Sequence, residues 1–364
     1  MVSLPDTTKM GIEATFTAHT TIYEHGIHQW CSSVPCVWLS QLHGLIGRLY
    51  YYLVALLGIA STFSNGPILM NETGNDVRLA VSPCCGLLPG IVSDVNTGVN
   101  IGAIKTIVSF GDSYTDGGND DGSPLEPAVL IPPSVLAGGR SANGPVWIEG
   151  LANKSGAVLM SYAQWGACID LSIWPSNPRK VDLIGQMTTF LDQDKELDPE
   201  TTLYSLFFGI NDFGDSKVDG DHLDNAAEAL LEQIDTLSNP PINGRLFMIS
   251  DVYGQGEHAD RGERFKQIIY DGLYDLHVGN KHLEIAYVDF GRIWDGVLGA
   301  TPGYETFGYT TTEQCTECYE NCDENGWCDD PDHHFYWIPG HPSKETHRIM
   351  ADYVHEVLTL CRIS

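Results

Sequence analysis

Basic side chains are scarce in this chain of 364 residues. Lys and Arg together number 19 against 48 Asp and Glu, which gives a formal net charge of −29. Nucleic-acid binding needs a basic surface, and an anionic membrane surface repels so acidic a chain. Both partner classes are therefore excluded. Because 43% of the residues are hydrophobic and 10% are aromatic, the chain can still bury a core. We expect the protein to be a monomer.

The chain also lacks an apolar run long enough to span a membrane, which needs about 20 residues. Its densest apolar stretch is Leu49–Phe63, preceded by Arg48 and containing the small residues Gly58-Ile59-Ala60. A positive flank, a short apolar region and small residues are the order found in a secretory signal. We interpret residues 48–63 as a signal-peptide-like segment behind extra N-terminal sequence, and expect a secreted, extracellular protein. A buried core helix and a signal anchor remain alternatives.

Charge and patterning change near residue 100. Residues 1–100 carry three basic and six acidic side chains, so residues 101–364 hold −26 of the net charge of −29. The first hundred residues show little periodicity apart from the apolar run. We therefore predict an N-terminal extension over residues 1–100 and a folded domain over residues 101–364.

From residue 104 onward, short β-branched or aromatic runs alternate with longer amphipathic segments. The predicted strands are Thr106–Phe110, Ala157–Tyr162, Thr202–Phe208, Arg245–Ile249 and Glu284–Val288. The predicted helices are Pro145–Ser155, Asp182–Asp194, Leu223–Leu237, Glu263–Val278 and Lys344–Leu360. This alternation is typical of βαβ units. It predicts a three-layer α/β/α domain with a mainly parallel five-stranded sheet, whose site lies beyond the carboxyl ends of the strands.

Four short blocks follow predicted strands or precede helices. They contain Ser113 in Phe110–Asp116, Gly144 in Arg140–Trp147, Asn211 in Phe208–Asp212 and His341 in Ile338–Ser343. Each residue has an ordinary explanation: a helix cap for the serine, helix punctuation for the glycine, a turn residue for the asparagine and one surface histidine among thirteen. Their occurrence together, between the predicted strands and helices, favours a shared site.

In this order the blocks resemble the GDSL (SGNH) esterase superfamily, in particular its fungal, secreted carbohydrate acetylesterase branch. The resemblance covers about residues 104–360 and implies an SGNH-hydrolase fold, which is flavodoxin-like. It also implies that Ser113 is the nucleophile and His341 the general base. The oxyanion donors would be the backbone N–H groups of Ser113 and Gly144 and the side-chain amide of Asn211. No cofactor is implied.

One position departs from the family pattern. The aspartate that usually stands three residues before the histidine is replaced by Ile338. Either a carboxylate from elsewhere orients the imidazole, in which case Asp332 is our candidate, or a backbone carbonyl such as that of Ile338 does so. A solvated loop charge is the ordinary explanation for Asp332.

The predicted insertion at residues 301–337 contains Cys315, Cys318, Cys322 and Cys328, followed by His333-His334. Zinc binding is conceivable, but the spacing matches no common ligand pair, and secretion favours disulfides. We therefore expect disulfides and no metal, with connectivity left open among six cysteines that include Cys168 and Cys361. Sequons at Asn71 and Asn153 suit a secreted glycoprotein.

The resemblance implies that the substrate is a short-chain ester, acetyl above all, on small molecules or plant-polysaccharide-derived oligosaccharides. Aromatic residues near the blocks could stack on sugar rings, although core packing is their ordinary role. Two alternatives remain open: a lipase or lysophospholipase on the same scaffold, and a non-catalytic carbohydrate-binding protein.

Overall fold

The computed structural model describes residues 76–129, 136–317 and 326–363. The signal-like segment at residues 48–63, the sequon at Asn71, and Cys318 and Cys322 lie outside these ranges. No helix of the described residues is long and apolar enough to cross a membrane.

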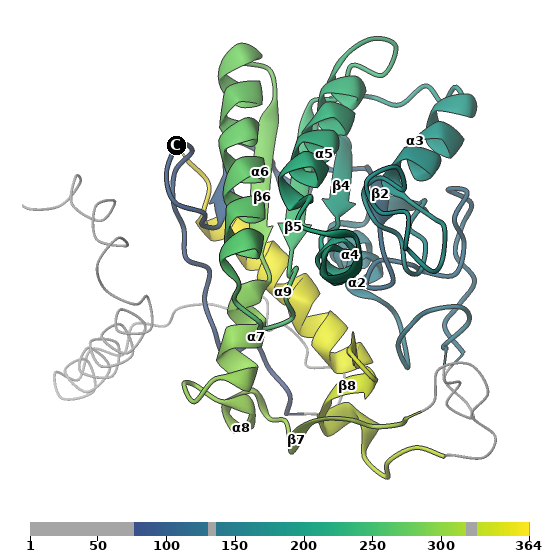
Figure 1. Ribbon diagram of the computed structural model, residues 1–364, viewed down its shortest axis with the longest axis vertical. Helices are drawn as coiled ribbons and strands as arrows, with labels where there is room; N and C mark the ends of the chain where they lie inside the picture. The colour runs from purple at the N-terminus through teal and green to yellow at the C-terminus, as the bar shows by residue number, and fades with distance from the viewer. Residues whose placement is uncertain (1–75, 130–135, 318–325, 364) are drawn as a thin grey trace, which may run out of the picture.

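The elements of the described chain follow one another as predicted, with additions (Figure 1). In order they are β1 (Val95–Asn96), β2 (Thr106–Gly111), α2 (Trp147–Ser155), β3 (Val158–Ser161), α3 (Leu183–Asp192), β4 (Thr202–Phe207), α4 (Ile210–Asp219), α5 (Leu223–Ser238), β5 (Leu246–Asp251), α6 (Asp260–Gly279), β6 (Glu284–Asp289), α7 (Gly291–Leu298), α8 (Tyr304–Phe307), β7 (Thr311–Gln314), β8 (His334–Ile338), β9 (His341–Pro342) and α9 (Lys344–Leu360). All five predicted strands and all five predicted helices are present. Helices α4, α7 and α8 and the short strands β1, β7, β8 and β9 were not predicted.

The main sheet has the strand order β1-β6-β5-β4-β2-β3. Strands β2 to β6 pair in parallel, and only β1 is antiparallel, at one edge. The prediction of a mainly parallel α/β sheet is therefore confirmed, with a sixth, two-residue strand added. The order of the parallel strands is that of a flavodoxin-like doubly wound sheet, in which β2 and β4 are neighbours and their carboxyl ends meet.

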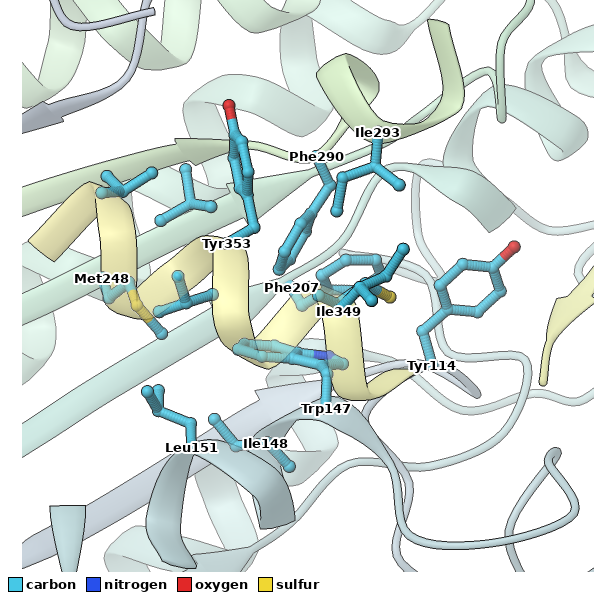
Figure 2. Packing of buried hydrophobic residues seen from close by; sticks show 14 of the residues in the cluster. Tyr114, Trp147, Ile148, Leu151, Phe207, Met248, Phe290, Ile293, Ile349 and Tyr353 are labelled. Atoms are coloured by element: carbon cyan, nitrogen blue, oxygen red, sulfur yellow. The ribbon is translucent and has the colours of Figure 1, made fainter. Parts of the chain in front are cut away.

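Helices cover both faces of the sheet. Successive strand residues point to opposite faces, so each parallel strand contributes to two hydrophobic clusters. In β5, Met248 belongs to the cluster under α2, α7 and α9, whereas Phe247 and Ile249 belong to the cluster under α3, α5 and α6. Figure 1 shows α5 and α6 side by side and α9 running obliquely across the sheet. In the first cluster, Trp147 of α2 packs edge-on against Phe290 with ring centroids 5.3 Å apart (Figure 2).

Residues 76–100 are part of this domain, so the predicted boundary at residue 100 lies too late. Val95 and Val99 are fully buried, and β1 pairs with β6. The buried Asp94 carboxylate accepts a hydrogen bond of 2.6 Å from the hydroxyl of Tyr353 on α9. A two-residue strand leaves no periodicity in the sequence, which explains why this segment could not be placed by pattern alone.

The cysteines form disulfides within and between distant segments. Cys315 pairs with Cys328 inside the insertion, a connectivity that the sequence left open. Cys361, at the end of α9, pairs with Cys85, 276 residues earlier in the chain. Cys168 is a buried free thiol. The disulfides suit an oxidising compartment.

Candidate active site

Ser113 stands two residues beyond the last residue of β2. The Oδ1 atom of Asp112 accepts the backbone N–H of Tyr114 at 2.9 Å, which closes a tight turn around the serine. A Cβ at Gly111 would lie 2.8 Å from the Cβ of Thr115 and 3.1 Å from the carbonyl oxygen of Phe207, so the strand needs glycine here. The turn leaves Ser113 only 5% exposed at the carboxyl edge of the sheet.

His341 reaches the same edge from the two-residue strand β9, just before α9. Its Nε2 lies 3.0 Å from the Oγ of Ser113, and its Nδ1 lies 2.9 Å from the carbonyl oxygen of Pro339. A carbonyl only accepts hydrogen bonds, so Nδ1 carries the proton and Nε2 is free to accept one from the serine. The two residues that the sequence placed 228 positions apart thus form a nucleophile–base pair.

The imidazole of His341 is enclosed by two aromatic rings. The centroid of the imidazole lies 5.8 Å from the ring centroid of Tyr114 and 6.0 Å from that of Trp165, which it meets edge-on. Burial lowers the pKa of His341 to about 4, and the hydrogen bond to Pro339 partly opposes this effect. The imidazole is therefore neutral, and able to act as a base, in mildly acidic as well as neutral solution.

Asp332 does not occupy the orienting position that we predicted for it. Its Oδ1 atom lies 2.9 Å from the Nζ of Lys344, in a partly exposed ion pair, while Nδ1 of His341 faces the Pro339 carbonyl. The residue three positions before the histidine, Ile338, is fully buried beside Trp337. The structure thus supports the second alternative, a backbone carbonyl, although it is that of Pro339 and not of Ile338.

The three predicted oxyanion donors come from three separate segments. Within the part of the chain that the structure describes, neither the buried backbone N–H of Ser113 nor that of Gly144 has a hydrogen-bond acceptor. Asn211, in the first turn of α4, donates one hydrogen of its amide to the carbonyl of Ala167 at 2.9 Å. An amide nitrogen carries two hydrogens, so the second remains for a ligand.

Gly144 is held against the helix that follows the histidine. A Cβ at this position would lie 2.7 Å from the Cβ of Lys344, so only glycine allows this approach. The neighbouring Asn143 accepts the backbone N–H of Lys344 at 2.7 Å through Oδ1. The glycine block is thereby fixed to the start of α9, three residues after His341.

Among the described residues, no group of three or more His, Cys, Asp and Glu side chains could hold a metal ion. His333, which we considered as a ligand, pairs instead with Asp330 at 2.8 Å and Asp76 at 2.9 Å. No step of the chemistry considered below requires a metal.

Sequence reasoning missed the Pro339 carbonyl as the partner of His341. A backbone carbonyl leaves no side-chain signal; only the Pro-Gly pair before the histidine indicates a fixed turn there. Trp165 was noted only as one aromatic among several, and its contact with His341 could not be read from the chain.

The chain was compared with known families and structures. Residues 107–354 match the family model described as GDSL-like Lipase/Acylhydrolase. The chain belongs to this family. The family is described as one of lipases and acylhydrolases. No curated protein matches the chain.

Several solved structures are similar to this GDSL protein at low identity. One is an active-site mutant of a family two carbohydrate esterase from Clostridium thermocellum in complex with celluohexase, 14% identical with a TM-score of 0.39, covering 69% of this chain and 62% of that one. Another is a carbohydrate esterase family 2 enzyme plus carbohydrate-binding domain from Corynascus thermopiles, 14% identical with a TM-score of 0.40, covering 71% and 66%. A third is phospholipase A1 from Streptomyces albidoflavus, 14% identical with a TM-score of 0.33, covering 70% and 98%. The chain thus spans less than two thirds of the first two proteins.

Proposed function

We propose that this GDSL protein is a secreted serine esterase that hydrolyses short-chain carboxylic esters through an acyl-enzyme on Ser113. The observation that carries the proposal is the 3.0 Å contact between the Oγ of Ser113 and the Nε2 of His341. The 2.9 Å hydrogen bond from Nδ1 to the Pro339 carbonyl leaves Nε2 as the acceptor. This is the geometry that general-base activation of a serine requires.

The reaction would proceed in two halves. Oγ of Ser113 attacks the ester carbonyl carbon while its proton passes to Nε2 of His341. The tetrahedral oxyanion is stabilised by the backbone N–H groups of Ser113 and Gly144 and by the amide of Asn211. The carbon–oxygen bond then breaks and the alcohol leaves with the proton from Nε2. In the second half, water attacks the acyl-enzyme by the same route and releases the acid.

For the substrate we propose an acetyl ester on a neutral oligosaccharide derived from plant polysaccharide. The support is local: Trp165 is half-buried beside His341 and carries the guanidinium of Arg179 at 4.6 Å from its ring centroid. An indole held in place next to the base could stack on a sugar ring that carries the ester. A net charge of −29 would also disfavour anionic substrates.

The test is to measure initial hydrolysis rates on an aryl acetate and an aryl octanoate. Ser113→Ala should abolish activity, because it removes the nucleophile. Ser109→Ala is the matched control: it also removes a buried serine hydroxyl, from β2, but one with no hydrogen-bond partner in the described structure. It should retain the rate of the unmodified enzyme.

Each outcome has a definite meaning. A strong preference for acetate would support the acetylesterase, and acetylated xylo-oligosaccharides would be tried next, where Trp165→Ala should raise KM. A preference for octanoate would contradict it in favour of a lipase. Activity no higher than that of Ser113→Ala on either ester would contradict catalysis and favour a carbohydrate-binding protein.

A further inference from the structure

The loop that carries His341 is held by the side chains of Tyr114, next to the nucleophile, and Gln255, outside the predicted blocks. The carbonyl oxygen of Gly340 accepts a hydrogen bond of 2.6 Å from the hydroxyl of Tyr114 and one of 2.8 Å from the Nε2 of Gln255. The same Nε2 also donates to the Tyr114 hydroxyl. Three polar groups from three distant segments thus meet on the peptide that joins Gly340 to His341.

We propose that Tyr114 and Gln255 form a positioning clamp for the catalytic histidine. The inference rests on the proposed function, in which His341 is the base. Two consecutive backbone carbonyls then have separate roles. That of Pro339 accepts the Nδ1–H of His341 and sets the tautomer, and that of Gly340 accepts hydrogen bonds from the two clamp residues. The clamp does for the backbone what a carboxylate does for the imidazole in a triad.

Tyr114 suits this role because it follows the nucleophile directly. Its backbone N–H is bound by the carboxylate of Asp112, which shapes the turn around Ser113. Its ring lies against Phe207 and Trp294 with centroid distances of 5.6 and 5.9 Å. Figure 2 shows the hydroxyl directed away from this apolar cluster. One rigid side chain therefore connects the turn of the nucleophile to the loop of the base, and fixes the distance between them.

Gln255 stands in the loop after β5, in a conformation that few side chains adopt. Its φ is +49°, in the left-handed region, and its backbone N–H donates to the carbonyl of Val252 at 2.9 Å. Gln255 adopts this strained backbone conformation while its side-chain amide donates to Gly340 in another loop. This combination indicates that the position of the amide matters more than the cost of the strain. Gly340, which receives the bond, has a φ of +69° and closes the turn before His341.

The variants that test the clamp are Tyr114→Phe and Gln255→Met. The first keeps the ring and its packing but removes the hydroxyl; the second keeps an unbranched side chain of similar length but removes the donor. We expect each to lower kcat about 10-fold to 100-fold with KM changed by less than about 3-fold, because misplacing a base by a fraction of an ångström slows the chemical step more than binding. The double variant should be less than additive, because both donors act on one carbonyl.

A second readout separates positioning from loss of stability. A loosened loop would let water reach the imidazole, so the acid limb of kcat/KM should move up from about pH 4 towards the ordinary value of about 6.5. Tyr162→Phe is the matched control, since Tyr162 donates to another glutamine, Gln193, at 2.7 Å and takes no part in the clamp. It should leave both kcat and the limb unchanged.

The clamp is overturned if both variants keep kcat within about 2-fold of the unmodified enzyme, or lose kcat without moving the acid limb. If Ser113→Ala is inactive in that case, the proposed function stands and only the clamp falls. If Ser113→Ala retains activity, the proposed function itself fails and the clamp with it.

Discussion

The low pKa of His341 leads to a prediction about activity in acid. The perturbation is pH alone, and the group that titrates is the imidazole whose Nε2 must be unprotonated to take the proton of Ser113. Burial between Tyr114 and Trp165 removes water that would solvate the imidazolium, which lowers the pKa to about 4. Activity should therefore be present above pH 4 and be lost as the pH falls through that value.

The magnitude is large enough to measure without ambiguity. With a pKa of about 4, about nine tenths of the enzyme carries a neutral His341 at pH 5. A histidine of ordinary pKa, about 6.5, would be neutral in only about 3% of molecules at that pH. The two cases thus differ about 30-fold in kcat/KM at pH 5, and even a pKa of about 5 would leave half of the plateau value.

The assay is kcat/KM on phenyl acetate between about pH 3.5 and 8, with the released phenol measured by chromatography so that detection does not depend on pH. The pH dependence of kcat/KM reports the pKa values of groups in the free enzyme. Circular dichroism at each pH confirms that the protein remains folded, and Ser109→Ala should give the same profile. A limb near pH 6.5 in folded protein would refute the reasoning from burial.

Three further predictions concern stability and the rejected acid. Asp332→Asn should keep kcat within about 2-fold and cost at most about 1 kcal/mol, because its ion pair with Lys344 is partly exposed; a 10-fold loss of kcat would reinstate the carboxylate. Cys361→Ser should lower the unfolding free energy by about 3–5 kcal/mol, seen as a reduced Tm, because it opens a link over 276 residues; an unchanged Tm would contradict this. Burial raises the pKa of Asp212 from about 4 to about 7, so the stability that its protonated form provides should be lost as the pH rises from about 4 to about 7. Asp212→Asn should therefore lose less stability than the unmodified protein between about pH 5 and 7, and equal losses in urea titrations would show that this carboxyl does not titrate there.

The alternation of strands and helices could be predicted because each element satisfies its own local requirement. In α9, Ile349, Tyr353 and Val357 recur at helical spacing and all are fully buried. The element bounds differed by only a few residues. Strand β1 and helix α8 could not be found in this way, because two or four residues hold no periodic pattern, and their placement depends on β6 and on the surrounding loops.

Distance along the chain was a poor guide to the orienting group of His341. Asp332 lies nine positions before the histidine, yet the chain between them forms β8, whose pairing with β9 carries the aspartate to Lys344. The observed partner, the backbone carbonyl of Pro339, is a group that every residue has, so its role leaves no signal in the sequence. The role that we propose for Gln255 could not be predicted from the sequence either, since it depends on a backbone angle and on a carbonyl 85 positions away.

The sequence by itself determined the fold class, because strands alternate with helices, and its resemblance to the GDSL family implied the candidate residues Ser113, Gly144, Asn211 and His341. Only the tertiary structure decided how the histidine is held. Hydrogen bonds to backbone carbonyls depend on the orientation of individual peptides, and that orientation follows from the packing of distant segments and not from the identity of the residues involved.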